Sequence, residues 1–348
     1  MSNPATSNDA RRLAWLRRQL AFRRLSAVYI LIGLILIFSL VVPETFLDTG
    51  TWRSILDTQA LTALAAVGLT VPTAAGVFNL AVGAEIGLTC MFVAWMLVNH
   101  GASIPTTIVL TLALGIAIGL VSSFLVTVVG IDSFIATLAL SSVGAALAFA
   151  ISGGTQILGM PTALSDFSTG RLAGLSYPFL VMMAVAFVIW YVLEFTPLGR
   201  RIYATGGGEE AARLAGVRTG LIMTITLVTC AVTSAIVGIL LAARLGTGDP
   251  TVGPSFLLPA FSAVFLGATQ FKAGRFNVWG TVVSVYVLAV GVKGLQLAGA
   301  PVWIPDLFNG LALLLAVALS KPDRLIALTR RLLARRPRLG EVQVAPGQ

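Results

Sequence analysis

The sequence predicts an all-α integral membrane protein with about ten transmembrane helices. Of its 348 residues, 57% are hydrophobic and only 11% are charged, whereas a soluble domain carries roughly 25% charged residues. Apolar runs of about 20 residues, the length that spans a bilayer, recur from residue 26 to residue 320. The basic residues gather in short blocks beside these runs, which is the pattern of membrane orientation and not of nucleic-acid binding.

The apolar runs define the expected spans. Their approximate positions are 26–43, 58–76, 80–98, 105–129, 133–152, 177–194, 219–242, 256–271, 276–297 and 303–320. The second and third are nearly continuous, with breaks expected at Pro72 and around Gly76 to Gly83. Eight or nine spans, with a broken or re-entrant segment in this region, remain an alternative.

The distribution of basic residues predicts the orientation. With a cytoplasmic amino terminus, most of the 23 Lys and Arg residues fall on the inner side. The expected outer segments are 44–57, 153–176 and 243–255. These outer segments keep only Arg53, Arg171 and Arg244. Both termini are therefore expected in the cytoplasm, and the Gly-, Ser-, Thr- and Pro-rich middle outer segment is expected to carry structure of its own.

Three parts of the chain follow from this pattern. Residues 1–25 form a basic cytoplasmic segment without the features of a cleavable signal. Residues 26–320 form the transmembrane domain. Residues 321–348 form a basic cytoplasmic tail, whose end, EVQVAPGQ, is expected to be disordered. The two cysteines, Cys90 and Cys230, lie in apolar runs and give neither a disulfide framework nor metal-ligand spacing.

The sequence lacks the signatures of an enzyme. A phosphate-binding P-loop needs a lysine followed by Ser or Thr, and none of Lys272, Lys293 and Lys321 is so followed. The single histidine, His100, has no base or nucleophile pattern beside it. We therefore expect no catalytic residues, no metal and no cofactor in this chain.

Ionisable groups within spans are functional candidates, because burying a charge in a membrane is costly. Glu85 lies a few residues into the third span and is either functional or an interface residue. Lys293 lies near the outer end of the ninth span, where its stem can reach the headgroups. Asp132 precedes the fifth span and is expected to cap that helix.

A polar interval, residues 196–219, separates the sixth and seventh spans. It predicts a short helix from Glu209 to Ala215, with Glu209 and Arg213 paired four residues apart. The glycines at 206–208 are expected to let the chain turn sharply into this helix. Such a short helix is marginal alone in water, so either the membrane domain or a partner holds it. An ordinary connecting loop with one helical turn is the alternative.

Residues 203–217, YATGGGEEAARLAGV, resemble the cytoplasmic coupling loop of the ribose-type sugar permeases of bacterial ABC importers, a family related to the branched-chain amino acid permeases. Three further segments are similar to the family's in the same order: GVFNLAVG at 76–83, SFIATLAL at 133–140, and residues 258–280. The resemblance extends over most of the chain from about 60 to 320. Residues 75–80 (AGVFNL) also echo residues 273–278 (AGRFNV), which suggests an internal repeat.

The resemblance implies a permease domain that works as a homodimer in the lipid of the bacterial inner membrane. It implies two separate ABC ATPase subunits that bind ATP and Mg²⁺, and a periplasmic substrate-binding protein that delivers the solute for alternating access. The residues implied in ATPase coupling are Gly206, Gly208, Glu209, Glu210, Ala211, Ala212, Arg213, Leu214 and Gly216. Candidate residues along the solute path are Phe78, Asn79, Glu85 and Asn277.

The chain departs from the family pattern in the segment at 76–83. Asn79 stands where the family usually has Asp, Ala81 where it has Ser, and Val77 where it has a second Gly. The solute is therefore open among ribose, another sugar, a polyol and a nucleoside. A secondary transporter or facilitator for a small polar solute is the alternative function, and Glu85 is its one candidate coupling carboxylate within a span.

Overall fold

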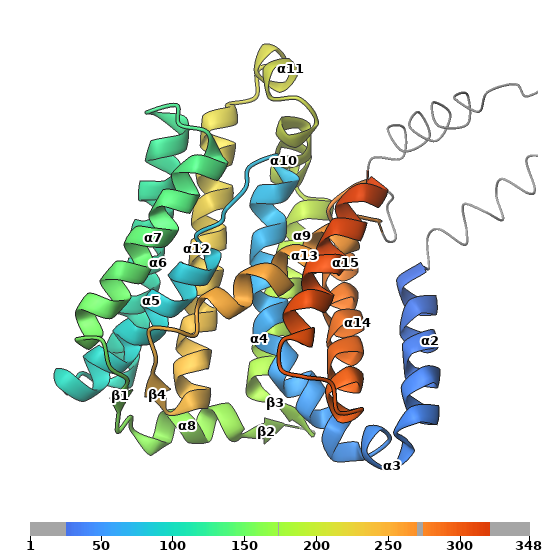
Figure 1. Ribbon diagram of the computed structural model, residues 1–348. Coiled ribbons are helices and arrows are strands. Elements are labelled where there is room, and N and C mark those ends of the chain that lie inside the picture. The colour runs from blue at the N-terminus through green and yellow to red at the C-terminus, as the bar shows by residue number, and fades with distance from the viewer. Residues whose placement is uncertain (1–25, 173, 270–273, 321–348) are drawn as a thin grey trace, which may run out of the picture.

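The computed structural model describes residues 26–172, 174–269 and 274–320. The expected basic segment 1–25 and tail 321–348 lie outside the described residues. The described chain is a bundle of helices that run roughly side by side (Figure 1). Helix α11 projects at one end of the bundle, called here the α11 end. Helix α8 and the short strands lie at the other, the α8 end.

The helices follow one another along almost the whole described chain. They are α2 (Ser26–Val41), α3 (Pro43–Phe46), α4 (Thr49–Ala74), α5 (Val82–Ala94), the π-helical turn η1 (Trp95–Asn99), α6 (Ile104–Thr127), α7 (Ser133–Ser152), α8 (Thr162–Thr169), α9 (Tyr177–Phe195), α10 (Pro197–Gly207), α11 (Glu209–Leu214), α12 (Thr219–Leu245), α13 (Pro254–Thr269), α14 (Val278–Leu297) and α15 (Ile304–Ser320). The strands are β1 (Ile157–Leu158), β2 (Arg171–Leu172), β3 (Leu175–Ser176) and β4 (Thr247–Gly248).

Apolar helices occupy every position where a span was expected. Within the described residues, seven are long and apolar enough to cross a membrane: α4, α5 with η1, α6, α7, α9, α12 and α14. Three shorter apolar helices, at Tyr29–Val41, Pro254–Thr269 and Ile304–Ala318, stand at the other three expected positions. The all-α membrane class is therefore confirmed, while the count of ten spans stays a prediction.

The second span begins earlier than expected. Residues 44–57 were predicted as an outer segment, but α3 and the first turns of α4 occupy most of it. Asp48 starts α4, because its carboxylate accepts a hydrogen bond from the backbone N–H of Gly50 at 3.0 Å. The expected break at Pro72 is also wrong, since α4 continues through Pro72 to Ala74. Membrane helices tolerate an internal proline where neighbouring groups satisfy the freed carbonyl.

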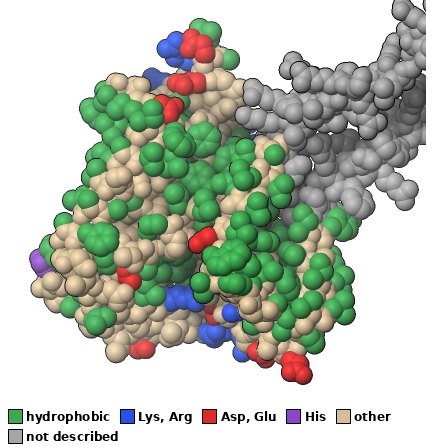
Figure 2. Space-filling view, in the orientation of Figure 1, with side chains coloured by type: hydrophobic (Ala, Val, Ile, Leu, Met, Phe, Trp, Pro, Cys, Tyr) green, Lys and Arg blue, Asp and Glu red, His purple; other side chains and the backbone are tan. Residues whose placement is uncertain are grey.

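Burial separates central from peripheral helices. The most apolar stretches of α4, α5 with η1, and α12 are each 72% buried, and that of α14 is 67% buried, whereas those of α6, α7 and α9 are 17–28% buried. Exposed leucines, valines and phenylalanines cover these peripheral helices (Figure 2). This arrangement suits helices whose outer faces contact lipid.

Small residues let α6 approach α12 closely. A Cβ at Gly119 would lie 2.6 Å from the Cα of Val228, and one at Gly115 would lie 3.0 Å from the carbonyl oxygen of Ala231. The two glycines are four residues apart on one face of α6. This is the spacing by which small residues bring membrane helices together.

Two similar breaks interrupt the helix pairs α4–α5 and α13–α14 at the α11 end. Each contains a glycine with φ near +80°, Gly76 in the first and Gly274 in the second, a conformation that glycine adopts without strain. Each also carries an asparagine whose side-chain oxygen accepts from a following backbone N–H, Asn79 from Ala81 and Asn277 from Gly280. These matched features agree with the internal repeat suggested by the sequence.

The α8 end carries the structure expected for residues 153–176. Strand β1 pairs antiparallel with β4, and β2 pairs antiparallel with β3. Helix α8 lies between β1 and β2 in sequence. The amide of Gln156 donates to the carboxylate of Asp249 at 2.6 Å. This bond and the β1–β4 pairing join residues 153–176 to residues 243–255, two segments that the sequence predicts on the outer side.

Candidate functional site: the α10–α11 element and the helix breaks

The polar interval is more helical than the sequence predicted. Helix α10 begins at Pro197, after Thr196, whose hydroxyl accepts from the N–H of Gly199 at 3.3 Å. It runs through Gly206 and Gly207, so the expected turn over three glycines is wrong. Only Gly208, with an extended backbone at φ 169°, separates α10 from α11.

Helix α11 spans Glu209–Leu214 and confirms the expected short helix to within one residue. A turn at Gly216 follows the helix, and the φ of +85° at this glycine lets the N–H of Val217 bond to the carbonyl of Ala212 at 3.0 Å. The predicted Glu209–Arg213 pair is wrong. Arg213 instead bonds to Glu210 at 2.7 Å, while Glu209 accepts from the hydroxyl of Thr219 at 3.4 Å.

Helix α11 presents most of its side chains outward. Leu214 is 81% exposed, and the Glu210–Arg213 pair is exposed as well. Glu209 and Ala211 are also exposed, whereas Ala212 is 6% exposed and faces the protein. In Figure 2, charged and apolar side chains stand together at this projecting tip. The tip therefore presents one large apolar side chain surrounded by charged ones, an arrangement like the apolar core and polar rim of a protein interface.

Helix α10 contacts the first break through a glycine. A Cβ at Gly206 would lie 2.1 Å from the carbonyl oxygen of Ala74, and one at Gly76 would lie 3.3 Å from the Cα of Gly206. The backbones of α10 and the end of α4 are therefore in direct contact.

Helix α10 contacts the second break through an aromatic residue. The hydroxyl of Tyr203 donates to the carbonyl oxygen of Phe276 at 2.8 Å. The guanidinium of Arg275 stacks over the Tyr203 ring, 3.7 Å from its centroid. Burial raises the pKa of the Tyr203 phenol, although Arg275 opposes this rise. The hydroxyl therefore stays protonated at neutral pH and can donate this bond.

Three of the four candidate path residues, Phe78, Asn79 and Glu85, lie at the first break and the start of α5. The amide of Asn79 donates to Glu85 Oε1 at 3.0 Å, and the two residues are 0% and 3% exposed. Phe78 stacks on Phe265 at 6.3 Å between ring centroids. Asn277 lies in the other break, where its amide donates to the carbonyl of Gly267 at 3.1 Å. Their role in a solute path stays a prediction.

The buried Glu85 has an asymmetric environment. Its Oε2 is buried and accepts no hydrogen bond from any described residue. A pocket of about 270 Å³ adjoins Glu85 and is otherwise lined by apolar side chains of α5, α6 and α7. Such walls offer little to a polyhydroxylated solute.

Asp132 was predicted as a helix cap, and the structure confirms this. Its carboxylate accepts from the backbone N–H groups of Phe134 and Ile135 at 3.0 and 3.4 Å. Sequence reasoning missed the contacts of Tyr203 and Arg275 with the second break. The only available signal was the echo between residues 75–80 and 273–278, which marks two equivalent breaks without indicating what touches them.

These features define a multi-pass membrane protein in which central helices are broken at one end and an exposed helical element contacts both breaks. The chain belongs to the family of permease components of branched-chain amino acid transport systems, whose model matches residues 53–317. Its relatives are transport subunits and not enzymes.

Curated relatives match over nearly their full length. The chain is 32% identical to the ribose import permease protein RbsC of Bacillus subtilis (strain 168), over 83% of this chain and 89% of that protein. It is 32% identical to RbsC of Escherichia coli (strain K12), over 87% and 94%. It is 30% identical to the autoinducer 2 import system permease protein LsrD of Yersinia enterocolitica, over 78% and 82%. No solved structure gives a significant match.

Proposed function

We propose that this chain is the membrane-spanning permease subunit of an ATP-driven ABC importer in the bacterial inner membrane. Two copies pass a sugar or sugar-like solute from a periplasmic binding protein to the cytoplasm by alternating access. Separate ABC ATPase subunits bind ATP and Mg²⁺ on the cytoplasmic side. In this arrangement the α11 end and both termini lie in the cytoplasm, and the α8 end faces the binding protein.

The observation that carries the proposal is the exposed helix α11 on a firm base. Helix α11 is too short to be stable alone, yet Ala212 packs inward and the turn at Gly216 closes its end. Leu214 and the Glu210–Arg213 pair are left outward as the surface that docks on the ATPase. An apolar side chain with charged neighbours matches the apolar core and polar rim of protein interfaces.

The contacts of α10 supply the route from the ATPase to the membrane helices. When the ATPase subunits close, they move α11 and with it α10. Gly206 carries this movement to the break after α4, and Tyr203 carries it to the break before α14. Because both breaks lie at the same end of the bundle, one movement changes both together. That is the requirement for opening and closing a path at that end.

The class of solute rests on the relatives. RbsC imports ribose and LsrD belongs to an autoinducer 2 import system, by their names. A small polyhydroxylated solute fits both. The particular solute has to be determined by experiment, because the chain differs from the family pattern at Val77, Asn79 and Ala81.

Reconstitution tests the proposal. The permease, purified with its ATPase subunits and placed in liposomes, is expected to take up solute delivered by the binding protein only when ATP is available on the α11 side. The permease without ATPase subunits is expected to show no uptake. Solute uptake by this chain alone, without ATP, would contradict the proposal.

The Tyr203 contact gives a milder test of the route. Tyr203→Phe removes the hydrogen bond to Phe276, and a neutral hydrogen bond contributes about 0.5–1.5 kcal/mol. We expect ATPase assembly to persist while the amount of solute moved per ATP falls about threefold to tenfold. Tyr191→Phe is the control, because Tyr191 is an exposed tyrosine on α9. If both variants move the same amount of solute per ATP, Tyr203 does not transmit the movement to the second break.

A secondary transporter is the second candidate, favoured by the buried, unsatisfied Oε2 of Glu85. Glu85→Gln keeps an acceptor for Asn79 and removes the ionisable carboxyl group. Under the ABC proposal, ATP-driven uptake is expected to stay within about twofold of the original, because that hydrogen bond persists. Uptake is measured with and without an imposed proton gradient. Gradient-driven uptake that Glu85→Gln abolishes would favour the secondary transporter.

A further inference from the structure

A pocket of about 320 Å³ lies in the α8 half of the bundle, between α4, α12, α13, α14 and α15. Figure 2 shows this face hollowed, with Lys or Arg side chains at the edge of the hollow. Small-molecule sites have volumes of about 300–1,000 Å³, so this pocket suits a small solute. Its residues are distinct from the four candidate path residues at the breaks.

Polar side chains without partners line the pocket. Asn309 of α15 is only 8% exposed, and its side-chain amide makes no hydrogen bond with any described residue. Gln59 and Thr62, one turn apart on α4, likewise have side chains that bond to nothing else in the described ranges. These side chains line the pocket, where a ligand can reach them. A ligand with several hydroxyl groups would satisfy all three side chains.

The opposite wall of the pocket is apolar. Phe256 of α13 and Val285 and Leu288 of α14 form part of it. A wall of hydrogen-bonding groups facing an aromatic and aliphatic wall matches a sugar-like ring, which has hydroxyl groups at its edge and C–H groups on its faces.

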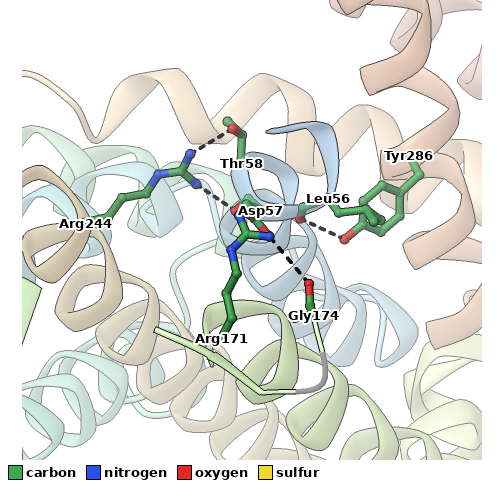
Figure 3. Close-up of polar contacts among 7 residues, drawn as sticks. All are labelled: Leu56, Asp57, Thr58, Arg171, Gly174, Arg244 and Tyr286. Atoms are coloured by element: carbon green, nitrogen blue, oxygen red, sulfur yellow. Dashed lines mark hydrogen bonds and ion pairs between the residues drawn. The ribbon is translucent and has the colours of Figure 1, made fainter. Parts of the chain in front are cut away.

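Arg244 lies at the mouth of the pocket and is held by α4 (Figure 3). Its guanidinium donates to the carbonyl of Asp57 at 2.7 Å and to the hydroxyl of Thr58 at 2.8 Å. Two of its five N–H groups are thereby used, and a guanidinium can donate from the others. Asp57 also pairs with Arg171 at 2.7 Å, so a carboxylate offsets part of the positive charge at this mouth.

We propose that this pocket binds the transported solute on its arrival from the α8 side, and that the solute is a neutral, polyhydroxylated small molecule. Gln59, Thr62 and Asn309 bind its hydroxyl groups, Phe256 contacts its ring face, and Arg244 acts as the specificity-determining residue at the mouth. The inference rests on the proposed import function and names the site at which import begins.

Single-cysteine labelling tests the pocket without the ATPase. Cys90 and Cys230, the two native cysteines, are both 0% exposed. Ser255→Cys therefore places an accessible thiol in the pocket of the full-length permease, and Thr162→Cys places one on exposed α8 as the matched control. Both are labelled in membranes with an impermeant thiol reagent, alone and with D-ribose, D-xylose, D-glucose or myo-inositol at high millimolar concentration.

We expect at least one of these four solutes to slow labelling of Ser255→Cys severalfold and to leave Thr162→Cys unchanged. Asn309→Leu on α15 and Gln59→Leu on α4 are each combined with Ser255→Cys. Each is expected to raise the solute concentration needed to slow labelling about fivefold to tenfold, as the loss of one hydrogen bond implies. D-gluconate, an anion of similar size, is expected to give no protection.

Absence of labelling at Ser255→Cys, protection by none of the four neutral solutes, or protection by D-gluconate alone would overturn the proposal. Because labelling needs no ATP, this failure is distinct from failure of the import function. If ATP-driven uptake is intact but no solute slows labelling of Ser255→Cys, only the proposed solute site is rejected. If a solute slows labelling of Ser255→Cys but ATP drives no uptake, only the proposed import function is rejected.

Discussion

Leu214→Asp is expected to separate the permease from its ATPase subunits and to abolish ATP-driven uptake. Leu214 is 81% exposed at the end of α11 and faces away from the membrane helices. Loss of a buried leucine side chain costs about 1.5–3 kcal/mol, which weakens assembly about 10-fold to 150-fold. A carboxylate in the same place adds the cost of burying an unpaired charge.

The fold of the permease is expected to survive this change, since Leu214 makes little buried contact of its own. The measurement is the amount of ATPase that co-purifies with the permease, together with the thermal unfolding midpoint of the permease alone. Leu172→Asp is the control, because Leu172 is 60% exposed but lies in β2 at the opposite end. Full ATPase assembly by Leu214→Asp would show that α11 is not the docking surface.

Gly206→Ala is expected to disturb the junction between α10 and α4, whereas Gly207→Ala is expected to be harmless. A Cβ at Gly206 meets the carbonyl oxygen of Ala74 at 2.1 Å, and backbone cannot move aside as a flexible side chain does. Overpacking of this kind costs about 1–3 kcal/mol. At Gly207 a Cβ would meet nothing within 4 Å, and alanine favours a helix by about 0.5–1 kcal/mol over glycine.

The pair of variants isolates the close contact, because both change glycine to alanine in the same helix. We expect Gly206→Ala to lower the thermal unfolding midpoint and the solute moved per ATP hydrolysed, with Gly207→Ala equal to the original protein or slightly more stable. Identical behaviour of the two variants would mean that α10 does not act on the first break through Gly206.

The sequence predicted the parts of this fold that depend on local pattern. The apolar runs predict the helices because each span must be apolar over its own length. The helix at 209–215 and the cap at Asp132 follow from charge and cap residues within a few positions of the helix starts. The segment at 76–83 was expected to break the chain, and the observed break at 75–81 lies there.

The errors arise where distant residues decide the structure. Glycine disfavours helices, so the run at 206–208 indicated a turn. Gly206 is instead needed in α10 because it lies against Ala74, 132 residues earlier in the chain. The spacing of residues in α11 allows Arg213 to pair with either Glu209 or Glu210. Glu209 accepts a hydrogen bond from Thr219, which follows α11 in the chain, and Arg213 pairs with Glu210.

The pocket at the α8 end was equally hidden from the sequence. Gln59 and Asn309 come from α4 and α15, and each alone is an ordinary polar residue near the end of an apolar run. Only the packing of five helices brings them to one cavity. Arg244 was assigned to an outer segment because it follows the apolar run at 219–242, and no sequence pattern links it to Asp57 and Thr58.

Site-specific cross-linking from α11 tests the central claim most directly. Leu214→Cys provides an exposed thiol in a chain whose own cysteines are buried. In the assembled transporter it is treated with a short thiol-to-amine cross-linker, and the partner is identified by mass spectrometry. We expect cross-links from Leu214→Cys to an ABC ATPase subunit, with a yield that changes between ATP-bound and nucleotide-free states, and none from Leu172→Cys. A transporter that remains active while Leu214→Cys forms no cross-link to an ATPase would contradict the account.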